Sequence, residues 1–297
     1  MRLPEIKNKI GLTQSIFGVT KALELVSAVK MKRATKLALG SRPFARKVVG
    51  ILKRLSEYEE SSKEVPFYFV PAEGKKILAV VIGSNKGFCG LYNKNILKFA
   101  EKEIEEFKKE AEVEIMAIGK KTINYFKKKN ERIRAEFLQI EDYQKFEKTK
   151  PLAALLFKYY REGEYQKILF YGTHYFNPFF QIPRKIQVLP LKKAVFAEML
   201  KKLAGESVVE KRCEYIFEPS LKEIVGQLVL RLIEFEIYHA ILEANASEHA
   251  SRMLAMKRAM DNAKEIIKDL TLEYNKSRQA QITAEVCEIT SAKEATK

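Results

Sequence analysis

Residues 221–274, LKEIVGQLVLRLIEFEIYHAILEANASEHASRMLAMKRAMDNAKEIIKDLTLEY, decide the fold of this chain. Apolar side chains recur there at alternating steps of four and three, which places them on one continuous stripe of a helix. Fourteen of the sixteen stripe positions are apolar. This heptad spacing predicts a left-handed coiled coil, in which the helix lies along a second helix. The stripe consists of Leu221, Val225, Leu228, Leu232, Phe235, His239, Leu242, Ala246, His249, Met253, Met256, Met260, Ala263, Ile267, Leu270 and Tyr274.

The predicted helix begins after Pro219, where Ser220 and Glu223 have the spacing of a capping box. We expect it to occupy residues 220–292, which corresponds to about 105 Å at 1.5 Å per residue. That is longer than a globular core requires. The stripe fades after Tyr274, and we expect the last turns to face a different neighbour through a second stripe of Ile282, Val286 and Ile289.

Residues 1–57 are expected to supply the partner helix. They are typical of a helix that is broken or kinked at 40–43, the sequence GSRP. Their apolar residues recur at steps of four and three, at Leu12, Ile16, Val19, Leu23 and Val26. The two ends of the chain are therefore predicted to pair as a long antiparallel coiled coil, with the middle of the chain inserted between them.

Residues 75–217 are predicted to form an inserted Rossmann-like α/β domain, after a linker that holds Pro66, Pro71 and Gly74. The order of elements is β-α-β-α-β-α-β-β, and such alternation is typical of a mainly parallel sheet covered by helices. The expected strands are 76–83, 113–119, 135–140, 167–176 and 185–191, and the expected helices are 92–109, 120–130 and 151–160.

Composition excludes several classes of protein. Hydrophobic residues make up 46% of the 297 residues, which favours a folded protein over a disordered one. Gly and Pro together number only 22, too few for the turns of an all-β sandwich or barrel. The three cysteines are scattered, which argues against disulfides and zinc and favours a reducing compartment. No apolar segment approaches a membrane span or a secretory signal, so a cytoplasmic protein is expected.

No enzymatic constellation is predicted. The glycines of Gly83–Gly90, GSNKGFCG, match neither nucleotide-binding spacing, so a tight turn is favoured over a phosphate loop. His239 and His249 lie ten residues apart on the stripe, which favours packing over metal binding. His174 has no serine, cysteine or carboxylate beside it in the sequence pattern that would make it a catalytic base. We therefore predict no cofactor and no metal.

The charge of the chain points to an acidic partner. The formal net charge is +16, and residues 1–56 hold thirteen Lys and Arg against only two Glu. A solvated helix usually mixes both signs, whereas this one does not, so an acidic surface is expected beside it. The alternative is a basic coiled-coil protein that binds nucleic acid, although residues 1–56 offer only Phe17 and Phe44 for stacking on bases.

Four segments together resemble the gamma subunit of F-type ATP synthase, of the bacterial type. They span the whole chain in the right order. Two departures are an Asn at position 85 in place of the usual Asp, and Ala292-Lys293 in place of a closing Gly-Ala. The segments are VTKALELVSAVKMKRA (19–34) with SRPFA (41–45), SNKGFCGLYN (84–93), NASEHASRMLAMKRAMDNA (245–263) and YNKSRQAQITAEVCEIT (274–290).

The resemblance implies a rotor shaft with no active site of its own. One gamma subunit stands inside a ring of alpha and beta subunits, and its α/β domain binds the epsilon subunit and the membrane rotor ring of c subunits. Proton flow turns the ring, and the shaft drives each beta subunit through its nucleotide states. The resemblance also implies a peripheral location at the cytoplasmic face of the cell membrane, and no nucleic acid partner.

The resemblance further implies which residues contact partners. Arg278, Gln279 and Thr283 match the contacts to the catch loop of beta, with Lys21 and Leu23 close by. The basic cluster of Lys30, Arg33 and Lys36 matches the part of the shaft that faces the acidic lever loop of beta. Tyr215 matches the foot near the rotor ring.

Overall fold

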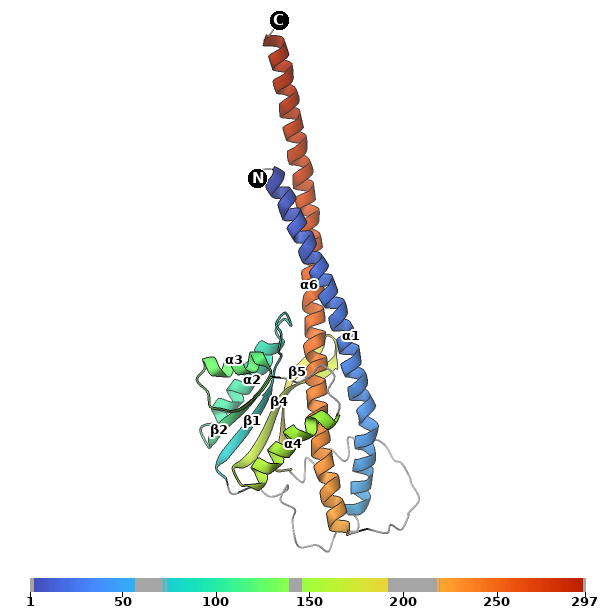
Figure 1. The fold of residues 1–297 in the computed structure, drawn as a ribbon, viewed down its shortest axis with the longest axis vertical. Helices are drawn as coiled ribbons and strands as arrows, with labels where there is room; N and C mark the ends of the chain where they lie inside the picture. The colour runs from blue at the N-terminus through green and yellow to red at the C-terminus, as the bar shows by residue number, and fades with distance from the viewer. Residues whose placement is uncertain are drawn as a thin grey trace. The chain divides into compact units, whose positions relative to one another are not determined.

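The computed structural model of the chain describes residues 3–56, 72, 74–138, 146–191, 218 and 220–295. These residues form two compact units, which are described separately here. The terminal unit comprises Met1–Ala28 with Arg252–Lys297, and the central unit comprises Val29–Ser251. Two long helices, α1 (Leu3–Ser56) and α6 (Leu221–Ala295), each contribute to both units (Figure 1).

The central unit contains a five-stranded sheet in the order β3-β2-β1-β4-β5. The first four strands in the chain are mutually parallel where they pair, and β5 runs antiparallel to β4. The elements follow one another in the predicted order, so the predicted Rossmann-like fold class is confirmed. Their bounds are β1 (Lys76–Ile82), α2 (Tyr92–Phe107), β2 (Glu112–Ile118), α3 (Lys120–Lys128), β3 (Ile133–Phe137), α4 (Phe146–Arg161), β4 (Tyr165–Asn177) and β5 (Phe180–Leu189).

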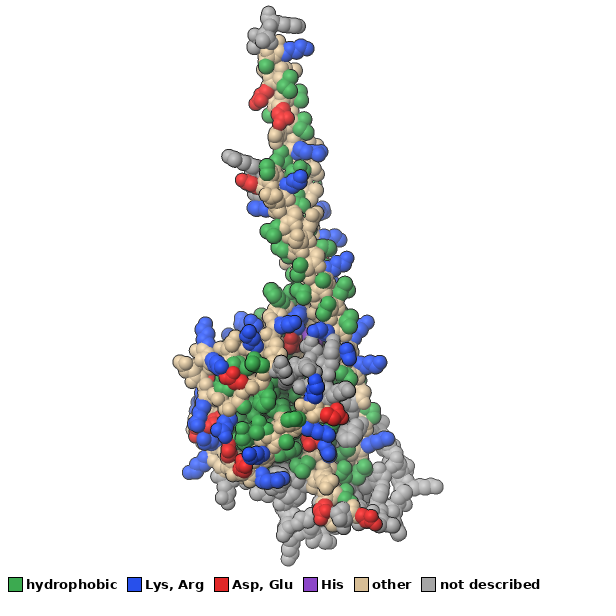
Figure 2. All heavy atoms as spheres, in the orientation of Figure 1, with side chains coloured by type: hydrophobic (Ala, Val, Ile, Leu, Met, Phe, Trp, Pro, Cys, Tyr) green, Lys and Arg blue, Asp and Glu red, His purple; other side chains and the backbone are tan. Residues whose placement is uncertain are grey.

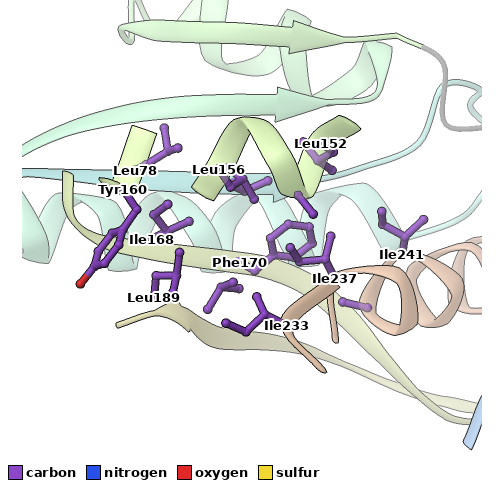
Figure 3. Close-up of a cluster of buried hydrophobic side chains, with 14 of the residues drawn as sticks. Leu78, Leu152, Leu156, Tyr160, Ile168, Phe170, Leu189, Ile233, Ile237 and Ile241 are labelled. Atoms are coloured by element: carbon purple, nitrogen blue, oxygen red, sulfur yellow. The ribbon is translucent and has the colours of Figure 1, made fainter. Parts of the chain in front are cut away.

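Each face of the sheet carries its own apolar core. Helices α2 and α3 cover one face, where Ile96, Ile115 and Phe126 are buried together. Helices α4 and α6 cover the other face, and Figure 3 shows Leu156 and Ile237 of these helices directed toward the sheet. Because both faces are covered, β1 and β2 are buried along almost their whole length, which fits the nearly continuous apolar run of β1 and the mostly apolar sequence of β2.

The two long helices are continuous. Helix α1 has 54 residues and continues through Pro43, so of the two expectations for 40–43, a break or a kink, the break is wrong. Proline inside a helix removes one backbone hydrogen bond and crowds the carbonyl four residues earlier, and α1 continues past Pro43 despite this cost. Helix α6 has 75 residues, about 110 Å at 1.5 Å per residue. At its start Ser220 Oγ accepts a hydrogen bond from Glu223 N at 3.3 Å.

In the terminal unit, the predicted stripe of α6 is the sheltered side of that helix. Met256 and Ala263 are buried, and Ile267, Leu270 and Tyr274 are half-buried. Their neighbours Ile266 and Leu272 are exposed. After Ser277 every side chain through Lys293 is exposed, which includes the second stripe of Ile282, Val286 and Ile289.

The predicted stripe of α1 is wrong. Leu12 is 64% exposed and Val19 is 60% exposed, with Ile16 and Val26 exposed as well, and only Leu23 is half-buried. The sheltered positions follow a neighbouring heptad register, in which large apolar side chains alternate with threonine, glutamate and serine. The register consists of Leu3, Ile6, Ile10, Thr13, Phe17, Thr20, Glu24 and Ser27.

The same register of α1 continues into the central unit with Met31, Ala34 and Ala38, all buried. There Ala38 packs with Tyr238 and Leu242 of α6. In this unit α1 and α6 run antiparallel (Figure 1), as predicted. The four large exposed side chains Leu12, Ile16, Val19 and Val26 are called the outer stripe of α1 below.

Candidate functional site

The glycine-rich loop after β1 is closed by its own hydrogen bonds. Ser84 is fully buried, and its backbone N–H donates to Asn93 Oδ1 at 3.0 Å. The N–H of Lys120, at the start of α3, donates to Asn85 Oδ1 at 3.0 Å. A phosphate cradle needs backbone donors such as these to be open to a ligand. Here the N–H groups of Ser84 and Lys120 already donate to side chains of the chain itself, which supports the prediction of a tight turn.

The glycines in this region allow two backbone segments to touch. Gly119 has a φ of +94°, and a Cβ on it would lie 2.3 Å from the carbonyl oxygen of Gly83. A Cβ on Gly83 would lie 2.3 Å from Thr122 Oγ1. Gly119 meets the backbone of Gly83 where the carboxyl ends of β1 and β2 come together, whereas a side chain at position 83 would meet the side chain of Thr122 on α3.

The position at which an open α/β sheet usually binds a ligand is filled by α6. In this sheet the strand order reverses between β1 and β4, and ligands bind at the carboxyl ends of the strands at such a point. Here Tyr92 Oη donates to Ala244 O at 3.2 Å, and Ser247 Oγ donates to Thr173 O at 3.4 Å. A helix of the chain itself thus lies across these strand ends.

A cluster of ionisable side chains joins β4 to α6 at the same place. His174 Nδ1 lies 2.7 Å from Glu243 Oε2, and His239 Nε2 lies 3.2 Å from Glu243 Oε1. We call these three residues the His–Glu–His cluster. The expectation that His174 has no carboxylate beside it is therefore wrong, because its carboxylate comes from α6, 69 residues later in the chain.

The electrostatics of the His–Glu–His cluster hold the carboxylate ionised. Burial raises the pKa of Glu243, but hydrogen bonds from His174 and His239 outweigh burial and lower that pKa to about 2. Nearby, burial raises the pKa of Glu236, against the opposing charges of His239 and Arg184. Among the described residues, no group of three or more His, Cys, Asp or Glu side chains has the arrangement of a metal site.

The residues expected to contact the catch loop lie in the terminal unit. Arg278, Gln279 and Thr283 are exposed on α6, and Thr283 Oγ1 donates back to Gln279 O at 2.9 Å. On α1 of the same unit, Lys21 is exposed and Leu23 is half-buried. Contacts to another chain require such outward positions.

The basic cluster lies on α1 in the central unit. Arg33 and Lys36 are exposed, and Lys30 is half-buried. Steps of three place the three side chains on neighbouring positions of the helix surface. Tyr215, expected at the foot, lies outside the described residues.

Exposed apolar side chains form rows on the terminal unit, of which the sequence analysis anticipated the stripe on α6 and missed the outer stripe of α1. Figure 2 shows such side chains along the described part of both helices, and they include the outer stripe and the stripe of Ile282, Val286 and Ile289. Apolar side chains that stay exposed in rows mark an interaction surface. The signal was present in α1, whose four large apolar residues were assigned to the inner side.

A search of the described helices finds none that is long and apolar enough to cross a membrane.

Comparison with known proteins finds relatives over the whole length. A family model described as ATP synthase matches residues 2–296. The ATP synthase gamma chain of Cytophaga hutchinsonii is 36% identical, over 99% of this chain and 98% of that protein. The ATP synthase gamma chain of Heliobacterium modesticaldum is 33% identical, over 96% of each.

Solved structures share the fold. A chain of the Tetrahymena thermophila mitochondrial ATP synthase, from its central stalk and c-ring, has a TM-score of 0.57 at 23% identity and covers 81% of this chain. That comparison covers 99% of the Tetrahymena chain. A chain of the Euglena gracilis mitochondrial ATP synthase has a TM-score of 0.63 at 17% identity, over 99% of this chain and 94% of that one. These similarities do not support the nucleic-acid-binding alternative.

Proposed function

This chain belongs to the ATP synthase gamma-chain family, and on that premise we propose that it is the central-stalk rotor shaft of an F-type ATP synthase. It couples transmembrane proton flow to conformational cycling of the catalytic beta subunits. The observation that carries this function is the terminal unit, in which two helices present rows of exposed apolar side chains. Contiguous exposed apolar side chains are uncommon on a monomeric soluble protein, whereas a shaft inside a ring of subunits would use them as contact surfaces for its partners.

The partners follow from the same family. One copy of the chain stands within the head of alpha and beta subunits, and its α/β domain binds the epsilon subunit and the membrane rotor ring of c subunits. The complex is membrane-associated, and this chain is its peripheral component at the cytoplasmic face. The absence of a spanning helix among the described residues is consistent with that role.

The chain performs no catalysis itself. Support comes from the α/β domain, where the loop after β1 uses its own donors and α6 lies across the usual ligand position. The enzyme is the assembled complex, and its nucleotide chemistry belongs to other subunits.

Two groups of residues make the contacts with beta. Arg278, Gln279 and Thr283, together with Lys21 and Leu23, contact the catch loop, and their exposed or half-buried positions in one unit support this. The basic cluster faces the acidic lever loop, as the excess of positive charge on α1 favours. Tyr215 belongs to the foot contact with the rotor ring.

Single-molecule rotation tests the function directly. The chain is co-expressed with its own alpha and beta subunits, the head is fixed to a surface, and a bead is attached to the α/β domain. We expect co-purification of the three subunits and rotation of the bead in one direction on addition of ATP. Failure of the chain to co-purify, or hydrolysis of ATP by the pure chain alone, contradicts the proposal.

A further inference from the structure

Helix α6 lies close to β4 along a row of small side chains. Four small residues of α6 meet the α/β domain here beside the larger Ile237 and Ile241: Ala240, Ala244, Ser247 and Ser251, at steps of four, three and four. A Cβ on Gly172 would lie 4.0 Å from Ala240 O, so the strand and the helix approach closely. Small side chains on both elements allow this approach.

Along this stretch, polar contacts also join α6 to the strands β4 and β5. Ser251 Oγ lies 3.0 Å from Gln181 Oε1, and Ser247 donates to Thr173 O. The charged contact is that of Glu243, whose side chain is only 8% exposed and whose two oxygens each meet a histidine. Glu236 of α6 interacts electrostatically with His239 and Glu243 of the cluster, and Arg184 of β5 interacts with Glu236.

The His–Glu–His cluster is directional in a way that apolar burial is not. Burial of apolar surface depends on area and not on angle, whereas a hydrogen bond weakens steeply when donor and acceptor are misaligned. Hydrogen bonds to an ionised group are also about twice as strong as neutral ones. Rotation of α6 on β4 would separate Glu243 from His174 and leave a carboxylate buried without one of its donors, which is costly.

Each histidine is held in its orientation by an aromatic ring. The His174 ring lies edge-on to Phe176 at 4.4 Å between centroids, and the His239 ring stacks on Phe235 at 5.8 Å. The other nitrogen of His239, Nδ1, is buried and has no hydrogen-bond partner among the described residues. Nε2 of the same ring makes the contact with Glu243.

We propose that the His–Glu–His cluster fixes the rotational position of α6 on the sheet, so that α6 turns together with the α/β domain under load. This inference rests on the proposed rotor function, because only a rotor must transmit torque across this contact. The apolar core beneath α6 holds the helix against the sheet, and the cluster sets its angle. His174 and Glu243 are positioning residues, not catalytic ones.

The test compares coupling with and without load in the reconstituted complex. Glu243→Gln keeps the shape of the side chain and removes its charge. Its matched control is Glu234→Gln, because Glu234 lies on the same helix but pairs with Arg231 of that helix at 2.9 Å and does not join it to the sheet. Protons pumped per ATP hydrolysed are measured in vesicles at zero gradient and against an increasing opposing gradient.

We expect Glu243→Gln to hydrolyse ATP at the wild-type rate and to pump normally without a gradient. Against a gradient, its protons pumped per ATP should fall several-fold below those of Glu234→Gln. Equal values for both variants at every gradient overturn the proposal. A wild-type complex that does not pump at all overturns the rotor function instead, so the two failures are distinguishable.

A pair of variants at His174 separates the hydrogen bond from mere packing. His174→Asn retains a donor near the position of Nδ1, and His174→Leu removes it. Coupling against a gradient should be largely retained in His174→Asn and lost in His174→Leu. Equal loss in both, in complexes that assemble to the same yield, shows that the hydrogen bond does not set the coupling, and this pair decides the question even if Glu243→Gln does not assemble.

Discussion

At the scale of single residues, two buried carboxylates join elements that are distant in sequence. Glu114 on β2 is 2% exposed and lies 3.1 Å from Lys76 Nζ and 3.2 Å from Arg132 Nη2. Burial raises the pKa of Glu114, but hydrogen bonds from Tyr165 and Lys76 together outweigh it and lower that pKa below its usual value. Glu243 is held in the same way by two histidines. Buried charges persist only where such donors surround them.

The low pKa of Glu243 makes stability depend on pH in a defined direction. A pKa of about 2 in the folded chain, against 4.5 for the free group, stabilises the fold above about pH 4.5. We expect this contribution, about 3 kcal/mol, to be lost as pH falls from 4.5 toward 2. Urea unfolding of the wild type and Glu243→Gln should show a gap in unfolding free energy that narrows over that window. A gap that stays constant from pH 6 to pH 3 contradicts the prediction.

We expect substitution of Gly119 to destabilise the fold strongly, because a side chain there would be unfavourable for two separate reasons. Gly119→Ala combines a φ of +94° with a Cβ only 2.3 Å from a backbone oxygen, and should lower the free energy of unfolding by more than about 3 kcal/mol. Gly163→Ala is the control, since its φ is +73° but nothing lies within 4 Å of the added Cβ. That variant should lose only about 1–2 kcal/mol. If thermal or urea unfolding shows the same loss of stability in both variants, the backbone at Gly83 moves away from the added Cβ at little cost, which contradicts the prediction.

At the scale of elements, the sequence predicts the pattern of strands and helices well and the register of α1 poorly. Runs such as KILAVVI are buried on both faces, so apolar content alone identifies them as strands. Helix α1 has two heptad registers, and the more apolar one, with Leu12 and Val19, is exposed. Hydrophobicity identifies the side of a helix that avoids water, but it does not tell whether the covering surface belongs to the same chain or to a partner.

The two stripes of α6 should respond differently to one kind of substitution. Ile267 is half-buried in the terminal unit, so Ile267→Asp places a carboxylate in a partly apolar contact and should destabilise that unit by about 1–3 kcal/mol. Ile282 is 50% exposed, so Ile282→Asp should leave the stability of the isolated chain nearly unchanged. The second variant should instead weaken assembly with alpha and beta subunits. Thermal unfolding of the chain and the yield of complex measure the two effects, and equal loss of stability in both variants would contradict the assignment of the stripes.

At the scale of the whole molecule, the sequence points to the partners more readily than to the contacts within the chain. The excess of positive charge on α1 and the exposed rows of apolar residues are both properties of single helices, which periodicity and composition report. The His–Glu–His cluster unites residues 69 positions apart, and its formation depends on how α6 lies on β4. No local pattern in the sequence specifies such a meeting, so His174 could not be matched with its carboxylate in advance.

The basic cluster provides a test of whether charge helps to transmit torque. Reversal of Lys30, Arg33 and Lys36 to Glu replaces attraction to an acidic lever with repulsion across a wet interface. Exposed ion pairs contribute only about 0.2–1 kcal/mol each, so the complex should still assemble. The number of protons pumped per ATP should fall, and the fall should be largest at low ionic strength, because salt screens charges at an exposed interface.

The control carries the same change in charge on the exposed residues Lys94, Lys98 and Lys102 of α2, and should leave coupling close to that of the wild type. ATP hydrolysis and proton pumping are measured together in vesicles across a salt series. A triple reversal on α1 with unchanged coupling and an unchanged response to salt would mean that shape alone transmits the torque at this contact.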